Sequence, residues 1–315
     1  MPPDVWVLYE AMLRSRLFER EVTRLWEQGL IAGEMHLGLG EEAICAGIVS
    51  QLQGGDALAL DHRGTPALLL RGVNPVALLR KFLGWEDGLC RGHGGHMHLF
   101  SPELPGASTG LVGATGLMAT GFALAAQHLL PGRVAIAFFG EGAMNEGALL
   151  EALNLAVVWR LPVLFVCKDN GWSITTHSPS VTGGALVERA HAFGMQALEV
   201  DGTDVIAVHD AAKTCLQRAR RGAGPSFVLA TCVHLEGHNP GEQAARTGRV
   251  VVIDEDYLGF GLSGEVAARL LESGIRPRFA RVATEATIPY ARHLESEVLP
   301  NTIRILEACR QVLAA

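Results

Sequence analysis

The fold of this chain is decided by residues 133–176, which read RVAIAFFGEGAMNEGALLEALNLAVVWRLPVLFVCKDNGWSITT. Apolar runs at residues 134–139 and 161–167 are short and continuous, which predicts two buried strands of a parallel sheet. Between them, residues 145–159 carry apolar side chains at helical spacing. The stretch is therefore predicted to form one strand–helix–strand unit.

Polar residues follow both predicted strands. Glu141, flanked by Gly140 and Gly142, follows the first strand, and the second ends in Asp169 and Asn170. Because the carboxyl ends of parallel strands lie at one edge of a sheet, we expect Glu141 and Asn170 to reach one cation. Their oxygens suit Mg²⁺, and backbone N–H groups at the glycines, with the N-terminus of the next helix, suit a phosphate. The alternative is an ordinary unit with turn glycines and a solvated Asp-Asn pair.

The stretch resembles the thiamine diphosphate motif, and most resembles the alpha subunit of the 2-oxo acid dehydrogenases of the pyruvate, branched-chain and acetoin type. The resemblance implies an α/β fold, in which helices cover both faces of a parallel sheet, and the cofactors thiamine diphosphate and Mg²⁺. It implies that the metal is held by Glu141, Asn170 and the backbone carbonyl of Trp172. It also implies that the cofactor lies against Gly140, Gly142 and Ala143.

Two residues depart from this motif. Glu141 replaces an aspartate, and Asp169 replaces the first of two asparagines. One extra methylene moves the carboxylate outward by about 1.5 Å, and Mg²⁺ tolerates little error in distance. The sequence thus predicts where the metal site lies. To accommodate the longer side chain of Glu141, either the backbone lies farther from the metal than in the family or the metal is a different one.

Other motifs of the family occur in the family's order. The resemblance implies that His36, in a glycine-rich loop before a helix opened by two glutamates, reaches the active site. Arg63 follows a predicted strand at residues 57–60 and matches an arginine that holds the diphosphate, a task that suits its planar fork. His62 stands beside it where the family has a tyrosine. The alternatives are a loop histidine without a role and a surface arginine.

Four further residues are implied to contact the cofactor. His98 matches a histidine near the cofactor, and a transition-metal site that includes His96 is the alternative. Gly110 and Val112 match residues whose backbones bond the aminopyrimidine ring. Ile174 matches the aliphatic residue that props the cofactor in its bent conformation, with a core isoleucine as the alternative.

The alpha-subunit resemblance extends from about residue 5 to residue 241. Near its end, His238 matches a histidine that contacts the diphosphate and the reacting centre, with a solvated loop histidine as the alternative. Residues 246–315 instead resemble the last part of the beta subunit and read as strand, helix, strand, loop and helix. We predict a diphosphate-binding domain at residues 1–245 and a partial transketolase C-terminal-like α/β domain at 246–315.

Composition restricts the class of protein. The 315 residues are 49% hydrophobic and include 37 glycines, which is typical of an α/β enzyme with many turns. A net charge of −7 gives no basic field for nucleic acid. The six cysteines form no Cys-x-x-Cys pair, and no apolar run approaches a membrane span. With no pattern of a signal peptide at the N-terminus, we expect a cytoplasmic protein without nucleic-acid or membrane partners.

The resemblance implies decarboxylation of a 2-oxo acid and transfer of the acyl unit to a lipoyl group. The family's glutamate that faces the pyrimidine ring has no match here, so we predict a separate beta-like chain that supplies it, in a heterotetramer. An acyloin-forming carboligase or transketolase-like subunit and a non-catalytic cofactor-binding subunit are the alternatives. A nicotinamide-dependent dehydrogenase is disfavoured, because no Gly-x-Gly-x-x-Gly follows the first strand.

Overall fold

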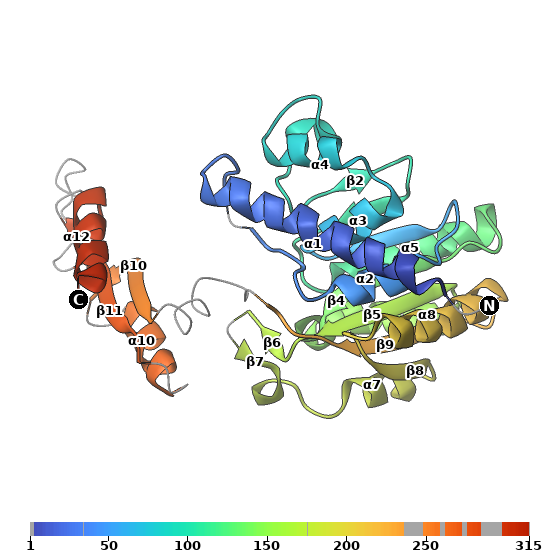
Figure 1. Cartoon of the computed structure of the whole chain (residues 1–315). Coiled ribbons are helices and arrows are strands. Elements are labelled where there is room, and N and C mark those ends of the chain that lie inside the picture. The colour runs from blue at the N-terminus through green and yellow to red at the C-terminus, as the bar shows by residue number, and fades with distance from the viewer. Residues whose placement is uncertain are drawn as a thin grey trace. The chain divides into compact units, whose positions relative to one another are not determined.

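The computed structural model describes residues 3–33, 35–174, 176–235, 248–258, 262–272, 276–284 and 298–314. The chain forms two compact units, which divide between Leu235 and Glu236 (Figure 1). The predicted domain boundary between residues 245 and 246 lies outside the described residues and stays a prediction.

The described part of the first unit is built on a seven-stranded sheet with the order β2-β3-β1-β4-β5-β9-β8. Its strands are β1 (Ala57–Leu60), β2 (Phe100–Ser101), β3 (Gly106–Ser108), β4 (Ala135–Gly140), β5 (Val163–Asp169), β8 (Gln196–Asp201) and β9 (Ser226–Thr231). All neighbours pair in parallel except β2 and β3, which are antiparallel. This arrangement confirms the predicted mainly parallel sheet.

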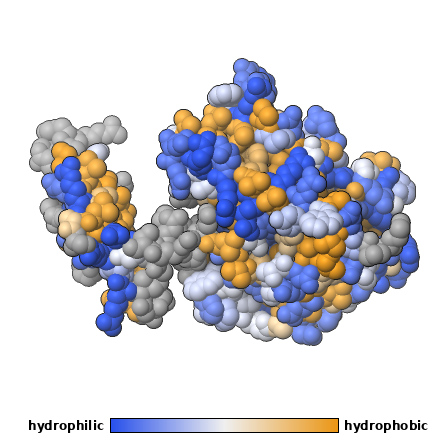
Figure 2. All heavy atoms as spheres, in the orientation of Figure 1, coloured by the Kyte–Doolittle hydropathy of each residue, from blue (hydrophilic) through white to orange (hydrophobic). Residues whose placement is uncertain are grey.

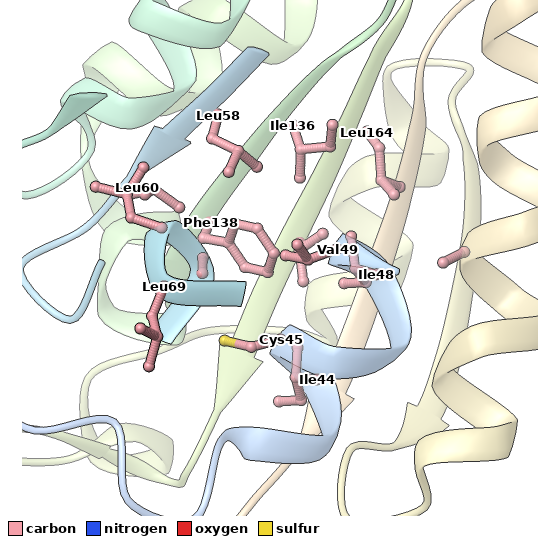
Figure 3. Packing of buried hydrophobic residues seen from close by; sticks show 14 of the residues in the cluster. Ile44, Cys45, Ile48, Val49, Leu58, Leu60, Leu69, Ile136, Phe138 and Leu164 are labelled. Carbon is pink, nitrogen blue, oxygen red and sulfur yellow. The ribbon is translucent and has the colours of Figure 1, made fainter. Parts of the chain in front are cut away.

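Helices cover both faces of this sheet, as predicted, because side chains alternate along the buried strands. Leu58, Ile136 and Leu164 lie in one apolar cluster (Figure 3), whereas Ala137 and Phe165 lie in another. The first cluster packs against α1 (Val5–Glu27), α2 (Glu42–Val49), α3 (Thr65–Arg71), α4 (Pro75–Phe82) and α8 (Val205–Arg220). The second packs against α5 (Ala114–Leu129), α6 (Gly147–Val158) and α7 (Leu186–Ala192).

The central stretch differs from its prediction at one point. The helix expected from residue 145 begins at Gly147, because a 3₁₀ turn, η2 (Glu141–Asn145), comes first. The N–H groups around Glu141 therefore belong to this turn, and the α-helix begins two residues later than predicted.

Beyond β5, a short antiparallel hairpin joins β6 (Trp172–Ser173) to β7 (Thr176–His177), and η3 (Ser178–Ser180) follows it. A further 3₁₀ segment, η1 (Leu89–Gly92), precedes β2. These segments carry or adjoin several of the predicted site residues.

The second unit has the predicted order of strand, helix, strand and helix in its described residues. It contains β10 (Arg249–Tyr257), α10 (Leu262–Glu272), β11 (Arg278–Thr284) and α12 (Thr302–Leu313), with β10 and β11 paired in parallel. Its core cluster holds small or medium side chains, namely Ala280, Val282, Ala308 and Val312. Apolar residues reach the surface of this unit (Figure 2), including Ile303 and Leu313 on α12.

Within the described residues, no helix combines the length and the apolar character that a membrane crossing needs.

Candidate active site

The predicted site residues gather where the parallel strands of the first unit end. Strand β4 ends at Gly140, and Gly140 lies opposite Lys168 of β5. Asp169, the last residue of β5, lies opposite Thr231 of β9. Loops after β1, β4, β5 and β9 therefore leave the sheet at one edge, as expected for a ligand site in a parallel α/β sheet.

Glu141 is buried at this edge, with 1% of its surface exposed. The Ser178 hydroxyl donates to Glu141 Oε1 over 2.6 Å. The pKa of Glu141 is raised, mainly by burial and to a smaller extent by the charge of Asp169. The Ser178 hydroxyl and the backbone N–H groups of Glu141 and Asn170 lower this pKa, but they do not offset the effect of burial. None of these groups is a cation. The result is a buried carboxylate that an oxygen-seeking divalent cation would suit.

Asn170 and Gly142 complete this part of the site. Asn170 Oδ1 accepts the backbone N–H of Trp172 over 2.9 Å, which turns the chain back after β5. A Cβ on Gly142 would lie 2.3 Å from Ser173 Oγ, so only glycine lets the turn after Glu141 approach this segment. Glu141, Asn170 and the turn at Gly142 thus form an oxygen-rich cradle at this edge of the sheet.

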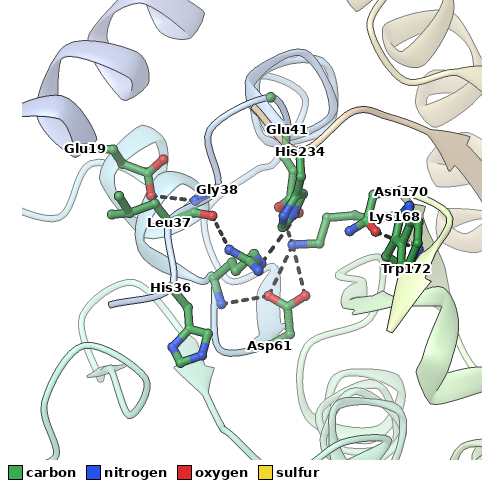
Figure 4. A network of polar contacts seen from close by, with 12 residues as sticks. Glu19, His36, Leu37, Gly38, Glu41, Asp61, Lys168, Asn170, Trp172 and His234 are labelled. Carbon is green, nitrogen blue, oxygen red and sulfur yellow. Dashed lines mark hydrogen bonds and ion pairs between the residues drawn. The ribbon is translucent and has the colours of Figure 1, made fainter. Parts of the chain in front are cut away.

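A buried network of charged groups lies beside this cradle (Figure 4). Lys168 Nζ lies 2.6 Å from Glu41 Oε2 and 2.9 Å from Asp61 Oδ2. His234 Nε2 lies 3.2 Å from the other oxygen of Glu41, and Arg63 Nε lies 4.0 Å from that oxygen. Two carboxylates and two cations thus share one water-poor region at the strand ends.

The network keeps its members ionised. Burial alone would raise the pKa of Glu41, but Lys168, His234 and Arg63 outweigh it and hold that pKa well below its usual range. Burial alone would lower the pKa of Lys168, but Asp61 and Glu41 raise it above its usual range. Each charge is therefore stabilised by the opposite charge beside it.

Three histidines form a cluster at the same edge. His96 Nε2 accepts the backbone N–H of His36 over 3.0 Å, and the two rings stack. The ring of His62 meets that of His36 edge-on at 5.0 Å between centroids. Burial lowers the pKa of His62 to about 3 and that of His96 to about 4. His62 and His96 are therefore neutral imidazoles near neutral pH.

The remaining predicted residues are placed as follows. The side chain of His98 lies near Gly110, where an added Cβ would be 3.7 Å from His98 Cε1. Val112 is exposed at the surface. Ile174 is exposed and has a φ of +57°, a left-handed conformation that a β-branched residue rarely adopts. His238 lies outside the described residues.

Sequence reasoning missed several members of this site. Lys168, Asp61 and Ser178 were not assigned a role. The glutamates at the start of α2 were assigned to the helix N-terminus, whereas Glu41 pairs with Lys168, 127 positions away. A signal was present in the sequence, because residues 43–49 read AICAGIV and are apolar on every face, which indicates a buried helix, and a charge at the start of a buried helix needs a partner.

Known proteins match this chain over most of its length. The profile of the dehydrogenase E1 component family matches residues 10–251. The alpha subunit of acetoin:2,6-dichlorophenolindophenol oxidoreductase from Cupriavidus necator is 42% identical over 238 residues, which cover 75% of this chain and 71% of that subunit. The chain belongs to the dehydrogenase E1 component family. The resemblance inferred from its central stretch to the alpha subunits of thiamine-diphosphate-dependent 2-oxo acid dehydrogenases is confirmed.

Other E1 relatives agree. The corresponding Bacillus subtilis subunit is 37% identical over 242 residues, which cover 75% of this chain and 71% of that subunit. The pyruvate dehydrogenase E1 component subunit alpha of Zymomonas mobilis is 35% identical over 249 residues, covering 78% of this chain and 70% of that subunit. Transketolase from Campylobacter jejuni has the same fold, with a TM-score of 0.52 at 19% identity over 73% of this chain. The E1 chain spans only 38% of that transketolase.

Proposed function

We propose that this chain is the diphosphate-binding subunit of a two-chain enzyme, which decarboxylates a 2-oxo acid with thiamine diphosphate and Mg²⁺. One structural observation supports the proposal independently of family membership. Glu141 and Asn170 follow neighbouring parallel strands, and the backbone N–H of Asn170 acts on the Glu141 carboxylate. A cation shared by the two side chains requires such neighbouring positions, and this supports the proposal.

Mg²⁺ would be held by Glu141, Asn170 and the backbone carbonyl of Trp172. The donor chemistry supports this, because all three supply oxygen atoms. The raised pKa of Glu141 supports it as well, since a cation would offset the cost of an ionised carboxylate in a buried place. The hydrogen bond from Ser178 would hold the longer glutamate side chain in position.

When bound, thiamine diphosphate supplies the electron sink for loss of CO₂. The residues of this chain would bind and orient it. The 3₁₀ turn at Glu141 offers backbone N–H groups to the diphosphate, together with Arg63. Ile174 and the backbones of Gly110 and Val112 would support the rings. His36 and His238 are the proposed catalytic histidines, which would donate or accept protons near the reacting carbon.

The pyrimidine half of the site would come from a separate beta-like chain that supplies the activating glutamate. The names of the relatives as alpha subunits support this. The described part of the second unit supports it too, because a sheet made of β10 and β11 has two open edges, which proteins normally pair or cover. We propose that the partner completes this sheet and that the pair doubles into a heterotetramer.

Acetoin or another acyloin is a second candidate substrate. The Cupriavidus necator and Bacillus subtilis relatives, at 42% and 37% identity, are named for acetoin, whereas the Zymomonas mobilis relative, at 35%, is named for pyruvate. In either case the proposed acceptor is the lipoyl group of a dehydrogenase complex, and transfer to an aldehyde is the alternative.

The metal site is tested by Glu141→Ala. We expect this change to abolish Mg²⁺-dependent binding of thiamine diphosphate, because it removes the charged ligand. Calorimetric titration of thiamine diphosphate with and without Mg²⁺ measures the effect. Glu151→Ala, an exposed glutamate on α6, is the matched control and should bind as wild type does. Unchanged cofactor affinity in Glu141→Ala would falsify the assignment.

The need for a partner is tested with the chain alone. Purified without a second chain and supplied with thiamine diphosphate, Mg²⁺ and a panel of 2-oxo acids and acetoin, it should release no CO₂ and cleave no acetoin. The reason is that it lacks a match to the activating glutamate. Robust turnover by the single chain would contradict the two-chain proposal.

A further inference from the structure

The loop that carries His36 is fixed by two buried side chains (Figure 4). Arg63 Nη1 donates to the backbone carbonyl of Leu37. Glu19 of α1 accepts the backbone N–H of the next residue, Gly38, over 3.0 Å through its Oε1. Because consecutive residues are bonded to side chains from different elements, the backbone next to His36 is held in one position.

Glu19 and Glu41 flank the same glycine. A Cβ on Gly38 would lie 3.6 Å from Glu19 Oε2 and 3.5 Å from Glu41 Oε2, with Pro66 Cγ at 3.0 Å. Glu41 is ionised in its pair with Lys168. A second negative charge on Glu19 would therefore lie close to an existing one in a buried region.

Glu19 itself is buried, with 1% of its surface exposed. In the described part of the chain, its Oε2 has no hydrogen-bond partner. Burial, followed by Glu41 and Glu42, raises the pKa of Glu19 to about 8, while the Gly38 N–H and Arg63 oppose this. The titratable and charged groups that face it or adjoin its partners are Glu41, Glu42, Cys45, Arg63 and the Arg16 side chain bonded to Glu42.

We propose that Glu19 is a positioning residue, which as an uncharged acid fixes Gly38 and thereby the loop that carries His36 beside His62 and His96. The proposal rests on the proposed active-site role of His36. A neutral carboxyl group still accepts a hydrogen bond through its carbonyl oxygen, so Glu19 can bond Gly38 without placing a charge beside Glu41.

This arrangement makes the folded chain sensitive to pH in one direction. Below an ordinary carboxyl pKa of 4.5, both the folded and the unfolded chain hold the proton, and the full stability is present. As pH rises towards about 8, the unfolded chain releases this proton first, so the folded state loses stability relative to it. A glutamine at position 19 keeps the acceptor oxygen and has no proton to lose.

The experiment compares full-length Glu19→Gln, Glu19→Leu and the control Glu10→Gln, an exposed glutamate on the same helix, with wild type. Urea unfolding at pH 6 and pH 9 gives the folding equilibrium constant. We expect the wild-type constant to fall roughly a hundredfold more between these pH values than that of Glu19→Gln. Amide hydrogen exchange of residues 35–41 should match wild type in Glu19→Gln and be at least about tenfold faster in Glu19→Leu.

Two results would overturn the proposal: a Glu19→Gln variant with the wild-type pH dependence, or a Glu19→Leu variant with wild-type exchange at residues 35–41. Thiamine diphosphate affinity and turnover of His36→Ala, measured with the partner chain, separate this proposal from the function. If the affinity and the turnover of His36→Ala both equal those of wild type, His36 is not an active-site residue. Glu19 would then not position an active-site residue. The exchange and pH results of the Glu19 variants do not depend on activity.

Discussion

Two glutamates are buried at the same edge of the sheet in opposite surroundings. Glu41 lies 2.6 Å from Lys168 and 3.2 Å from His234, and its pKa is held well below the usual range. Glu141 accepts a neutral hydroxyl from Ser178, and its pKa is raised by burial. Both side chains are almost fully buried, so exposure does not distinguish them.

The difference indicates what each carboxylate does. A buried carboxylate beside the protein's own cations is already compensated and serves the structure. A buried carboxylate without such a cation is not compensated by the protein's own charges. Binding of a cation from solution would stabilise its ionised form. By this criterion Glu41 organises the site, and the surroundings of Glu141 support its proposed role as a metal ligand.

The largest expected effect comes from removing the cation of Glu41. Lys168→Met leaves Glu41 and Asp61 buried without their shared partner, so we expect the free energy of unfolding to fall by about 3–5 kcal/mol. Urea unfolding followed by circular dichroism measures this. Lys213→Met on α8, where the lysine is half-buried, is the matched control. Equal losses in the two variants would contradict the role of the network.

A second pair of variants separates the two glutamates directly. Glu41→Gln should lower the free energy of unfolding by about 1–3 kcal/mol, because it leaves buried cations less compensated. Glu141→Gln, without metal, should cause no loss or a small gain. Its raised pKa means that ionisation costs the folded state stability as pH rises through that pKa, and glutamine removes this cost.

Unfolding is measured in metal-free buffer near pH 8, and cofactor binding is measured separately with Mg²⁺. Glu141→Gln should lose Mg²⁺-dependent binding, whereas Glu41→Gln should retain part of it. The comparison fails if both substitutions destabilise the metal-free chain to the same extent.

The smallest expected effect concerns the hydroxyl that holds Glu141. Ser178→Ala should weaken Mg²⁺ binding by about three- to tenfold, or about 0.7–1.4 kcal/mol, because one carboxylate oxygen is no longer fixed. Ser180→Ala is the control, since the exposed Ser180 hydroxyl donates to the backbone carbonyl of His177 instead. Calorimetric titration of Mg²⁺ with the cofactor present should therefore show a change for Ser178→Ala only.

The sequence predicted those features that local pattern determines. Apolar runs placed β4 and β5, and the crossover rule for parallel strands brought Glu141 and Asn170 to one edge. These predictions succeed because alternation, strand length and glycine turns are set by neighbouring residues. The helix before β5 was predicted to begin at residue 145 but begins at Gly147. A 3₁₀ turn occupies residues 141–145, and such turns are frequent at the N-termini of α-helices.

The identity of the partners in the charged network was beyond such reasoning, because these partners are distant in sequence. Nothing near Lys168 indicates that it meets Glu41 and Asp61, which lie 127 and 107 positions away. The burial of Glu19 was easier to predict from the sequence. The buried face of α1 contains Leu8, Ser15, Glu19 and Val22 at helical spacing. A carboxyl group on an apolar helix face signals either a partner or a neutral acid.

At Ile174, backbone stability and the proposed contact with the cofactor favour different residues. Its left-handed backbone, at a φ of +57°, costs an L-residue roughly 1–2 kcal/mol, which glycine would avoid. Selection for stability alone would therefore replace this exposed isoleucine by glycine or asparagine, whereas the proposed support of the cofactor requires a bulky aliphatic side chain. Under the proposed support of the cofactor, the two selective pressures act against each other at this position.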